Sequence, residues 1–293
     1  MAATERRTTR GTRMLTLACA TYASLCAAAQ KAHDAPQQSE SDHVRVTLIG
    51  EHTSLAPGQS LQIGLSLQHE PHWHTYWINP GDSGLATKLS WQLPAGFHAG
   101  EILWPTPQRF DVGGLFNFGY NGDALLPVQL DVPASAKPGS NAQLAVEARW
   151  LVCREECIPG KATLTLDLPI AAEAATDPRW QAAFAAARAA QPQPAAGWTG
   201  TAQDNGDRID VKLVGANLPH ATALDAFVVQ RQVVGYAPPQ VTHGANALNL
   251  SFAKSEYFTG APAALDLLLI DGAPPDTRTW SVHAPLAPAK SSP

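Results

Sequence analysis

Short segments in which hydrophobic and polar residues alternate run through most of the chain. In the first of them Val44, Val46 and Leu48 share one face, and Arg45 and Thr47 lie between them. Alternation with a period of two is the pattern of a β-strand that buries one face. The same pattern predicts further strands at 61–67, 73–77, 88–92, 101–104, 124–130, 142–152 and 161–168.

Turn sequences separate these predicted strands. Pro and Gly in segments 56–59 and 79–84 supply the fixed and the positive φ angles that tight turns need. Many short strands punctuated by turns are typical of an immunoglobulin-like β-sandwich. We therefore expect residues 43–171 to form one such sandwich.

A helical pattern replaces the alternation after residue 171. Asp177 is suited to cap a helix with Pro178 in its first position, and Trp180, Phe184 and Ala187 then form an apolar stripe at helical spacing. Because a Gln-Pro-Gln-Pro segment follows, we expect residues 172–196 to be a short helix and a linker.

A second series of alternating segments follows the linker. Strands are expected at 210–214, 226–230, 247–252 and 264–270. These would form a second, smaller β-sandwich-like domain at 197–286, with 287–293 as a loose tail. The predicted fold class is all-β: an immunoglobulin-like β-sandwich joined to this second domain by a short helix and linker.

The N-terminus has the pattern of a cleaved secretory signal peptide at residues 1–29. Four arginines precede an apolar stretch at about 14–25, and three alanines at 27–29 offer a cleavage site. The residues before Cys19 and Cys26 do not fit a lipoprotein signal, so no lipid anchor is expected. We expect a periplasmic protein with a disordered lead-in at 30–42.

Composition narrows the classes of partner and chemistry. The formal net charge is −5 and the predicted signal peptide is basic, so the remaining chain is acidic. An acidic surface argues against nucleic acid or an anionic membrane as a partner. The sequence holds no phosphate-binding loop, nucleophile elbow or zinc-protease motif, and we expect no bound cofactor.

Removal of the signal peptide would leave two cysteines, Cys153 and Cys157, in an oxidising compartment. They lie between the predicted strands 142–152 and 161–168, at or beside a hairpin tip. Three intervening residues let the chain turn back to disulfide distance. Closing so small a ring stabilises a fold by only about 2 kcal/mol. A short ring at an exposed tip is better suited to opening and closing by thiol exchange.

Two other uses of the pair stay open at this point. The disulfide could be purely structural, or the two cysteines could join His72 and His74 in a site for cuprous copper. The flanking charges do not identify a nucleophile, because Arg154 would favour a thiolate whereas Glu155 and Glu156 would oppose it.

Five motifs resemble the N-terminal periplasmic domain of the DsbD and ScsB thiol–disulfide reductases, with the ScsB branch as the nearer. They are residues 72–84 (HWHTYWINPGDSG), 104–107 (WPTP), 118–122 (FGYNG), 126–128 (LPV) and 150–159 (WLVCREECIP). The resemblance implies an immunoglobulin-like domain in which Cys153 and Cys157 form a redox-active pair. It also implies thioredoxin-like periplasmic oxidoreductases as partners, and for the ScsB branch an association with copper tolerance.

The resemblance further implies a cap loop that shields the cysteine pair with an aromatic side chain. Such a loop would lie within 111–118, with Phe116 as the cap and Phe110 or Phe118 as alternatives. His72, His74 and Tyr76 would form a wall of the site, or would serve only core and edge packing. The membrane and thioredoxin-like domains of the family do not appear in this sequence, so electrons would come from a separate membrane-embedded donor.

These observations predict a thiol–disulfide interchange protein. Cys153 and Cys157 would relay electrons to or from thioredoxin-like partners. The alternative is a non-redox periplasmic binding module, for copper handling or partner docking, in which the disulfide is structural.

Overall fold

The structure, a computed structural model, describes Met1 and residues 38–220, 224–272 and 277–287. All of these except Met1 belong to one compact unit, Gln37–Pro293. The predicted signal peptide and most of the predicted lead-in lie outside the described residues. No described helix is long and apolar enough to cross a membrane.

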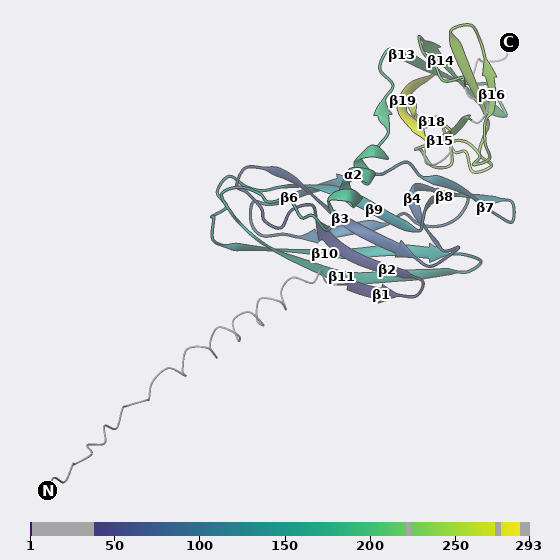
Figure 1. Ribbon diagram of the computed structural model, residues 1–293. Coiled ribbons are helices and arrows are strands. Elements are labelled where there is room, and N and C mark those ends of the chain that lie inside the picture. Colours follow the sequence, from purple (N-terminus) through teal and green to yellow (C-terminus); the bar gives the residue numbers. More distant parts are fainter. Residues whose placement is uncertain (2–37, 221–223, 273–276, 288–293) are drawn as a thin grey trace. The chain divides into compact units, whose positions relative to one another are not determined.

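The first part of the fold is a sandwich of two antiparallel sheets, here called the first sandwich (residues 38–170; Figure 1). One sheet has the order β1 (Gln38–Ser41), β2 (Val44–Gly50), β3 (Ser60–His69), β9 (Asp123–Asp131) and β6 (His98–Ile102). The other has the order β11 (Cys157–Pro169), β10 (Asn141–Cys153), β4 (His74–Gly81), β8 (Leu115–Asn121) and β7 (Gln108–Val112), and β5 (Lys88–Gln92) pairs with β10.

The core between the two sheets follows from the alternation in the sequence. Val46, Leu48 and Leu65 from the first sheet meet Val146 and Val152 from the second, and all five are almost completely buried. Burial of such side chains stabilises the fold by about 1.5–3 kcal/mol each. The predicted immunoglobulin-like sandwich is therefore confirmed.

Several segments of the first sandwich differ from the prediction, among them β7 and β8, where no strands were expected. Gln38–Ser41 forms β1 against β2, although the lead-in was expected to be disordered up to residue 42. Asn79, Pro80 and Gly81 belong to β4 rather than to a turn, because the strand passes through a bulge and pairs again at Gly81. The expected strand 101–104 lies earlier, at His98–Ile102.

One helix, α2 (Gln181–Ala189), follows the first sandwich. It begins three residues after the predicted Pro178, and the Asp177 carbonyl accepts a hydrogen bond from the Gln181 N–H. The predicted stripe is real, because Phe184 and Ala187 are buried in a cluster with Ile49 and Leu125 of the first sandwich. The helix is thus packed on the first sandwich.

The second β region, here called the second sandwich (residues 193–287), is built from the strands after α2. They are β12 (Gln193–Pro194), β13 (Trp198–Asp204), β14 (Arg208–Gly215), β15 (Leu224–Val228), β16 (Gln240–His243), β17 (Ala247–Ala253), β18 (Ala264–Asp271) and β19 (Arg278–Ala287). The strand order is β15-β18-β19-β13-β14-β17-β16, with β12 on β19.

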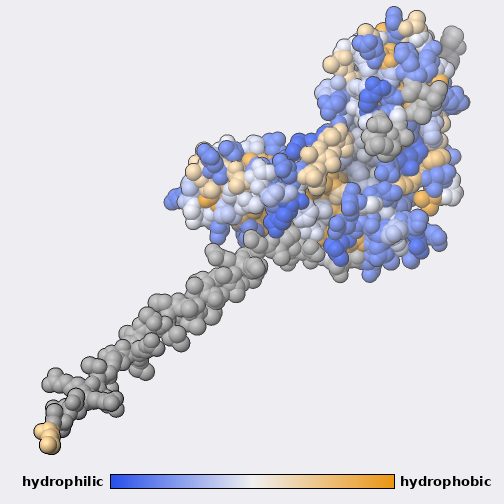
Figure 2. All heavy atoms as spheres, viewed as in Figure 1, coloured by the Kyte–Doolittle hydropathy of each residue, from blue (hydrophilic) through white to orange (hydrophobic). Residues whose placement is uncertain are grey.

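Its core takes alternate residues of these strands, such as Val211, Leu250 and Leu267. Sequence patterns located four of the eight strands and missed β12, β13, β16 and β19. The face of the molecule in Figure 2 is mostly hydrophilic with scattered apolar residues, as expected when the alternating apolar positions turn inward.

Candidate functional site

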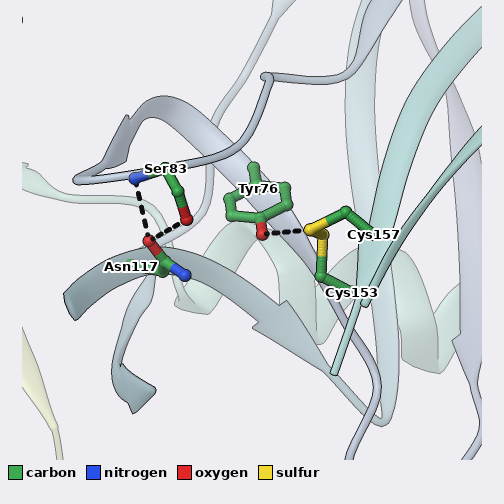
Figure 3. Close-up of a disulfide and its surroundings, with 5 residues drawn as sticks. All are labelled: Tyr76, Ser83, Asn117, Cys153 and Cys157. Carbon is green, nitrogen blue, oxygen red and sulfur yellow. Dashed lines mark hydrogen bonds between the residues drawn. A yellow bond between two sulfur atoms is a disulfide. The ribbon is translucent and has the colours of Figure 1, made fainter. Parts of the chain in front are cut away.

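The two cysteines close the hairpin formed by β10 and β11. Cys153 is the last residue of β10 and Cys157 the first of β11, and the two are direct cross-strand partners. They form a disulfide with a Cα–Cα distance of 4.2 Å (Figure 3). The Arg154 N–H donates a hydrogen bond of 3.0 Å to the Glu156 carbonyl and tightens the turn between them. The predicted hairpin-tip position is confirmed.

The two halves of the disulfide differ in exposure. Cys153 is only 2% exposed, whereas Cys157 belongs to the exposed residues of the tip. Thiol exchange needs a thiolate to reach a sulfur atom, so access decides which sulfur is attacked. Cys157 is therefore the more accessible half of the disulfide. The mixed charges of residues 154–156 gave no signal for this difference, which depends on how the tip packs.

Strand β4 supplies the wall beside the disulfide. His74 is the cross-strand partner of Cys153, and the Tyr76 hydroxyl lies 3.7 Å from the Cys157 sulfur (Figure 3). Burial raises the pKa of the Tyr76 hydroxyl to about 12, and a hydrogen bond with Ser83 partly offsets this rise. The hydroxyl thus keeps its proton near neutral pH and can donate it toward sulfur.

His74 is buried next to this pair and is uncharged near neutral pH. Burial lowers its pKa to about 4, and the nearby His69 adds to the effect. Its Nε2 atom has no hydrogen-bond partner among the described residues. The neighbouring His72 is exposed and has a φ angle of 72°, and it lies in the turn before β4.

The predicted cap loop is a β-hairpin, formed by β7 and β8. Phe110 of β7 stacks on the His74 ring at 4.6 Å with an interplanar angle of 22°. Phe116 and Phe118 of β8 are two residues apart and lie on the other face of the hairpin, opposite Asp111 and Arg109. Phe118 is buried there. Among the three candidate cap residues, Phe110 is thus the one that stacks on a residue of the wall, His74.

A turn after β4 fixes the position of Tyr76. The Ser83 N–H and hydroxyl both donate to the Asn117 side-chain oxygen, at 3.1 and 3.0 Å (Figure 3). The Phe116 N–H donates to the Asp82 carboxylate at 2.7 Å. Gly84 has a φ angle of 100° and lies so close to the Tyr76 ring that a Cβ atom would overlap it. Asn117 was not singled out from the sequence, and no local pattern marks it.

Arg154 of the hairpin tip is held by a stack of side chains. Its guanidinium lies 5.3 Å from the centre of the Trp73 ring, and Trp73 stacks on His43 at 3.8 Å. His43 in turn pairs with Glu70 at 2.6 Å.

Within the described ranges, no group of three or more His, Cys, Asp or Glu residues could hold a metal ion.

Comparisons with known proteins agree with this geometry. Residues 46–169 match the family model described as thiol:disulfide interchange protein DsbD, N-terminal. The N-terminal periplasmic domain of ScsB from Proteus mirabilis has 18% identity and a TM-score of 0.65, over 86% of this chain and 98% of that one. At this identity the likeness shows the fold alone, and it extends beyond the first sandwich.

Two further solved structures have TM-scores too low to indicate a shared fold. The GAE domain of yeast GGA1 has 13% identity and a TM-score of 0.26, over 45% of this chain and 98% of that one. The titin domains z1z2 in complex with telethonin have 11% identity and a TM-score of 0.20, over 86% of this chain and 100% of that one. No curated protein matches the chain.

Proposed function

Residues 46–169 form a domain of the DsbD N-terminal thiol–disulfide interchange family, and on this premise we propose that the chain relays electrons through Cys153 and Cys157 to or from thioredoxin-like partners. The observation that carries the proposal is the asymmetry of the disulfide. One cysteine is an exposed residue of the hairpin tip and the other is buried. Such a pair can form a mixed disulfide at one atom and resolve it with the other.

Donation of electrons takes two exchange steps. In the reduced chain the Cys157 thiolate attacks a partner disulfide, which forms the mixed disulfide and releases one partner thiolate. The Cys153 thiolate then attacks the Cys157 sulfur, which closes the ring and releases the second partner thiolate. Two electrons pass to the partner, and the two protons lost by the cysteines protonate its thiolates. Acceptance of electrons is the reverse sequence.

The wall residues assist the exposed sulfur in this scheme. A hydrogen bond from the Tyr76 hydroxyl stabilises negative charge on Cys157, and a thiolate stabilised in this way is both a nucleophile and a leaving group. The Phe110 ring covers His74, the neighbour of Cys153, and acts as the cap. No step requires a cofactor.

We also propose the periplasm as the site of action. The similar ScsB domain is described as periplasmic, and the arginine-rich, apolar N-terminus has the pattern of an export signal. An oxidising compartment would allow the disulfide to form, and a separate membrane-embedded protein would supply the electrons.

Electron transfer to a thioredoxin-fold protein tests the proposal. The reduced chain is mixed with an oxidised periplasmic thioredoxin-fold disulfide isomerase, and free thiols are alkylated at intervals and counted by mass. We expect transfer at least about 100 times faster than from glutathione at the same thiol concentration, because docking orients the sulfurs. A double variant carrying both Cys153→Ala and Cys157→Ala serves as the control. Transfer no faster than from glutathione would contradict the relay.

A further inference from the structure

The base of the β7–β8 hairpin is fastened to the second sandwich. The Arg109 side chain is only 10% exposed. Its guanidinium donates to both carboxylate oxygens of Asp225, at 2.6 and 3.0 Å. It also donates to the main-chain carbonyls of Tyr236 and Ala226. One arginine of the hairpin thus binds four acceptor atoms of the second sandwich.

Aromatic rings enclose the Arg109–Asp225 pair. The Arg109 guanidinium lies 4.8 Å from the ring centre of Phe118 and 4.7 Å from that of Phe227. The Phe118 ring meets Phe227 at 4.5 Å and Tyr236 at 5.6 Å, both edge to face. A bidentate ion pair is strongly directional, and loss of Asp225, which is itself 29% exposed, leaves the buried Arg109 charge unpaired.

A second hydrogen bond joins β4, the strand that forms the wall of the site, to β15, the strand that carries Asp225. The Asn79 side-chain amide of β4 donates to the Val228 carbonyl of β15 at 2.7 Å. Both β4, which carries His74 and Tyr76, and β7, which carries Phe110, are therefore held by β15. Of these side chains, His74 and Tyr76 lie beside the disulfide, and Phe110 covers His74.

The strand geometry links Arg109 to the cap residue beside it. Successive side chains of a strand point to opposite faces. When Arg109 is fixed against the second sandwich, Phe110 must project to the opposite face, where it stacks on His74. The other supports of the hairpin lie on β8, which pairs with β4 and bonds to Asp82 and Ser83, whereas β7 is the edge strand of its sheet. A Cβ atom at Gly113 or Gly114 would have nothing within 4 Å, and Leu115 is 51% exposed.

We propose that the second sandwich positions the cap of the redox site, with Arg109 and Asp225 as the positioning residues. The proposal rests on the proposed function, because it takes Cys153 and Cys157 as the reacting pair and Phe110 as the cap. Loss of the Arg109–Asp225 pair frees β7, withdraws Phe110 from His74 and opens the buried Cys153 side of the disulfide to thiols.

The test is the rate at which excess dithiothreitol reduces the disulfide in the full chain. Asp225→Asn and Arg109→Gln are expected to speed reduction by about tenfold, because a broken buried ion pair loosens the segment that it holds. Asp225→Glu keeps the carboxylate and is expected to restore most of the slow rate. The matched control is Asp204→Asn, which breaks the Lys254–Asp204 pair inside the second sandwich and should leave the rate unchanged.

A double variant separates cap positioning from a general loss of stability. Phe110→Ala removes the cap ring and is itself expected to speed reduction, and adding Asp225→Asn should then give no further increase. Arg109→Lys keeps the positive charge but cannot make both hydrogen bonds to Asp225. Its reduction rate, alone and with Phe110→Ala, gives the same test in a variant that leaves no carboxylate unpaired. Unchanged rates in the Arg109 and Asp225 variants, or a further increase in the Phe110→Ala background, would overturn the proposal.

A small thiol is the attacking reagent in this experiment, so no partner protein takes part. The proposed relay can fail in the transfer assay while cap positioning holds, and cap positioning can fail while transfer proceeds. The two proposals are therefore tested independently.

Discussion

A chain carrying Cys153→Ser is expected to accumulate a mixed disulfide with a thioredoxin-fold partner, whereas one carrying Cys157→Ser is expected to form almost none. Cys157 is exposed and Cys153 is 2% exposed, so only the first variant keeps a thiol that a partner can reach. Without Cys153 the chain has no thiol of its own beside Cys157 to resolve the mixed disulfide. We expect at least about a tenfold difference in trapped complex, measured on non-reducing gels after incubation with the oxidised partner.

The two cysteine variants control for each other. Both lose the same five-residue ring, which stabilises the fold by only about 2 kcal/mol. Cys153→Ser also buries a hydroxyl, so trapping is compared under conditions in which unfolding curves show both variants folded. A difference in trapping then reports the position of the remaining thiol. Equal trapping by both variants, or stronger trapping by Cys157→Ser, would contradict the assignment of Cys157 as the entry sulfur.

Gly119→Ala is expected to destabilise the first sandwich by about 3 kcal/mol, because added atoms in a packed interior force the backbone to move. Gly119 is the cross-strand partner of Tyr76, and a Cβ atom there would overlap the Thr75 carbonyl oxygen. Strands β4 and β8 must separate to admit it, which displaces Tyr76 from the disulfide. Urea unfolding followed by tryptophan fluorescence measures the loss.

Gly100→Ala is the matched control for this substitution. Gly100 also lies in a strand, β6, but a Cβ atom there meets only the Gln129 carbonyl at 3.8 Å, an ordinary contact. We expect its unfolding free energy to stay within about 0.5 kcal/mol of the natural chain. A Gly119→Ala chain as stable as the Gly100→Ala chain would show that β4 and β8 are not packed as described.

Sequence patterns predicted those strands in which the alternation of hydrophobic and polar residues matches the alternation of buried and exposed positions in the fold. Alternation located β2, β3, β9 and β10 because one face of each strand lies in the core. The cysteine hairpin was predicted for the same reason, since its two strands run into Cys153 and out of Cys157. The motif at 72–84 was recognised as a unit, and the structure gives its parts a physical role in holding Tyr76.

The β7–β8 hairpin escaped prediction because its burial does not alternate. Residues of β7 are exposed or half-buried, since one face meets the second sandwich and the other the disulfide. The cap residue could be chosen only once the strand register was known. That register places Phe110 on one face of the hairpin and Phe116 and Phe118 on the other. Arg109 and Asp225 are 116 residues apart, and no local pattern relates them.

The reduction potential of the Cys153–Cys157 pair tests the proposed relay most directly. The chain, freed of its N-terminal segment, is equilibrated in glutathione buffers of graded ratio, and free thiols are trapped by alkylation. We expect a potential of roughly −120 to −270 mV, the range of proteins that exchange disulfides. A potential below about −300 mV, or a pair that resists exchange while the chain is folded, would identify a structural disulfide and contradict the relay.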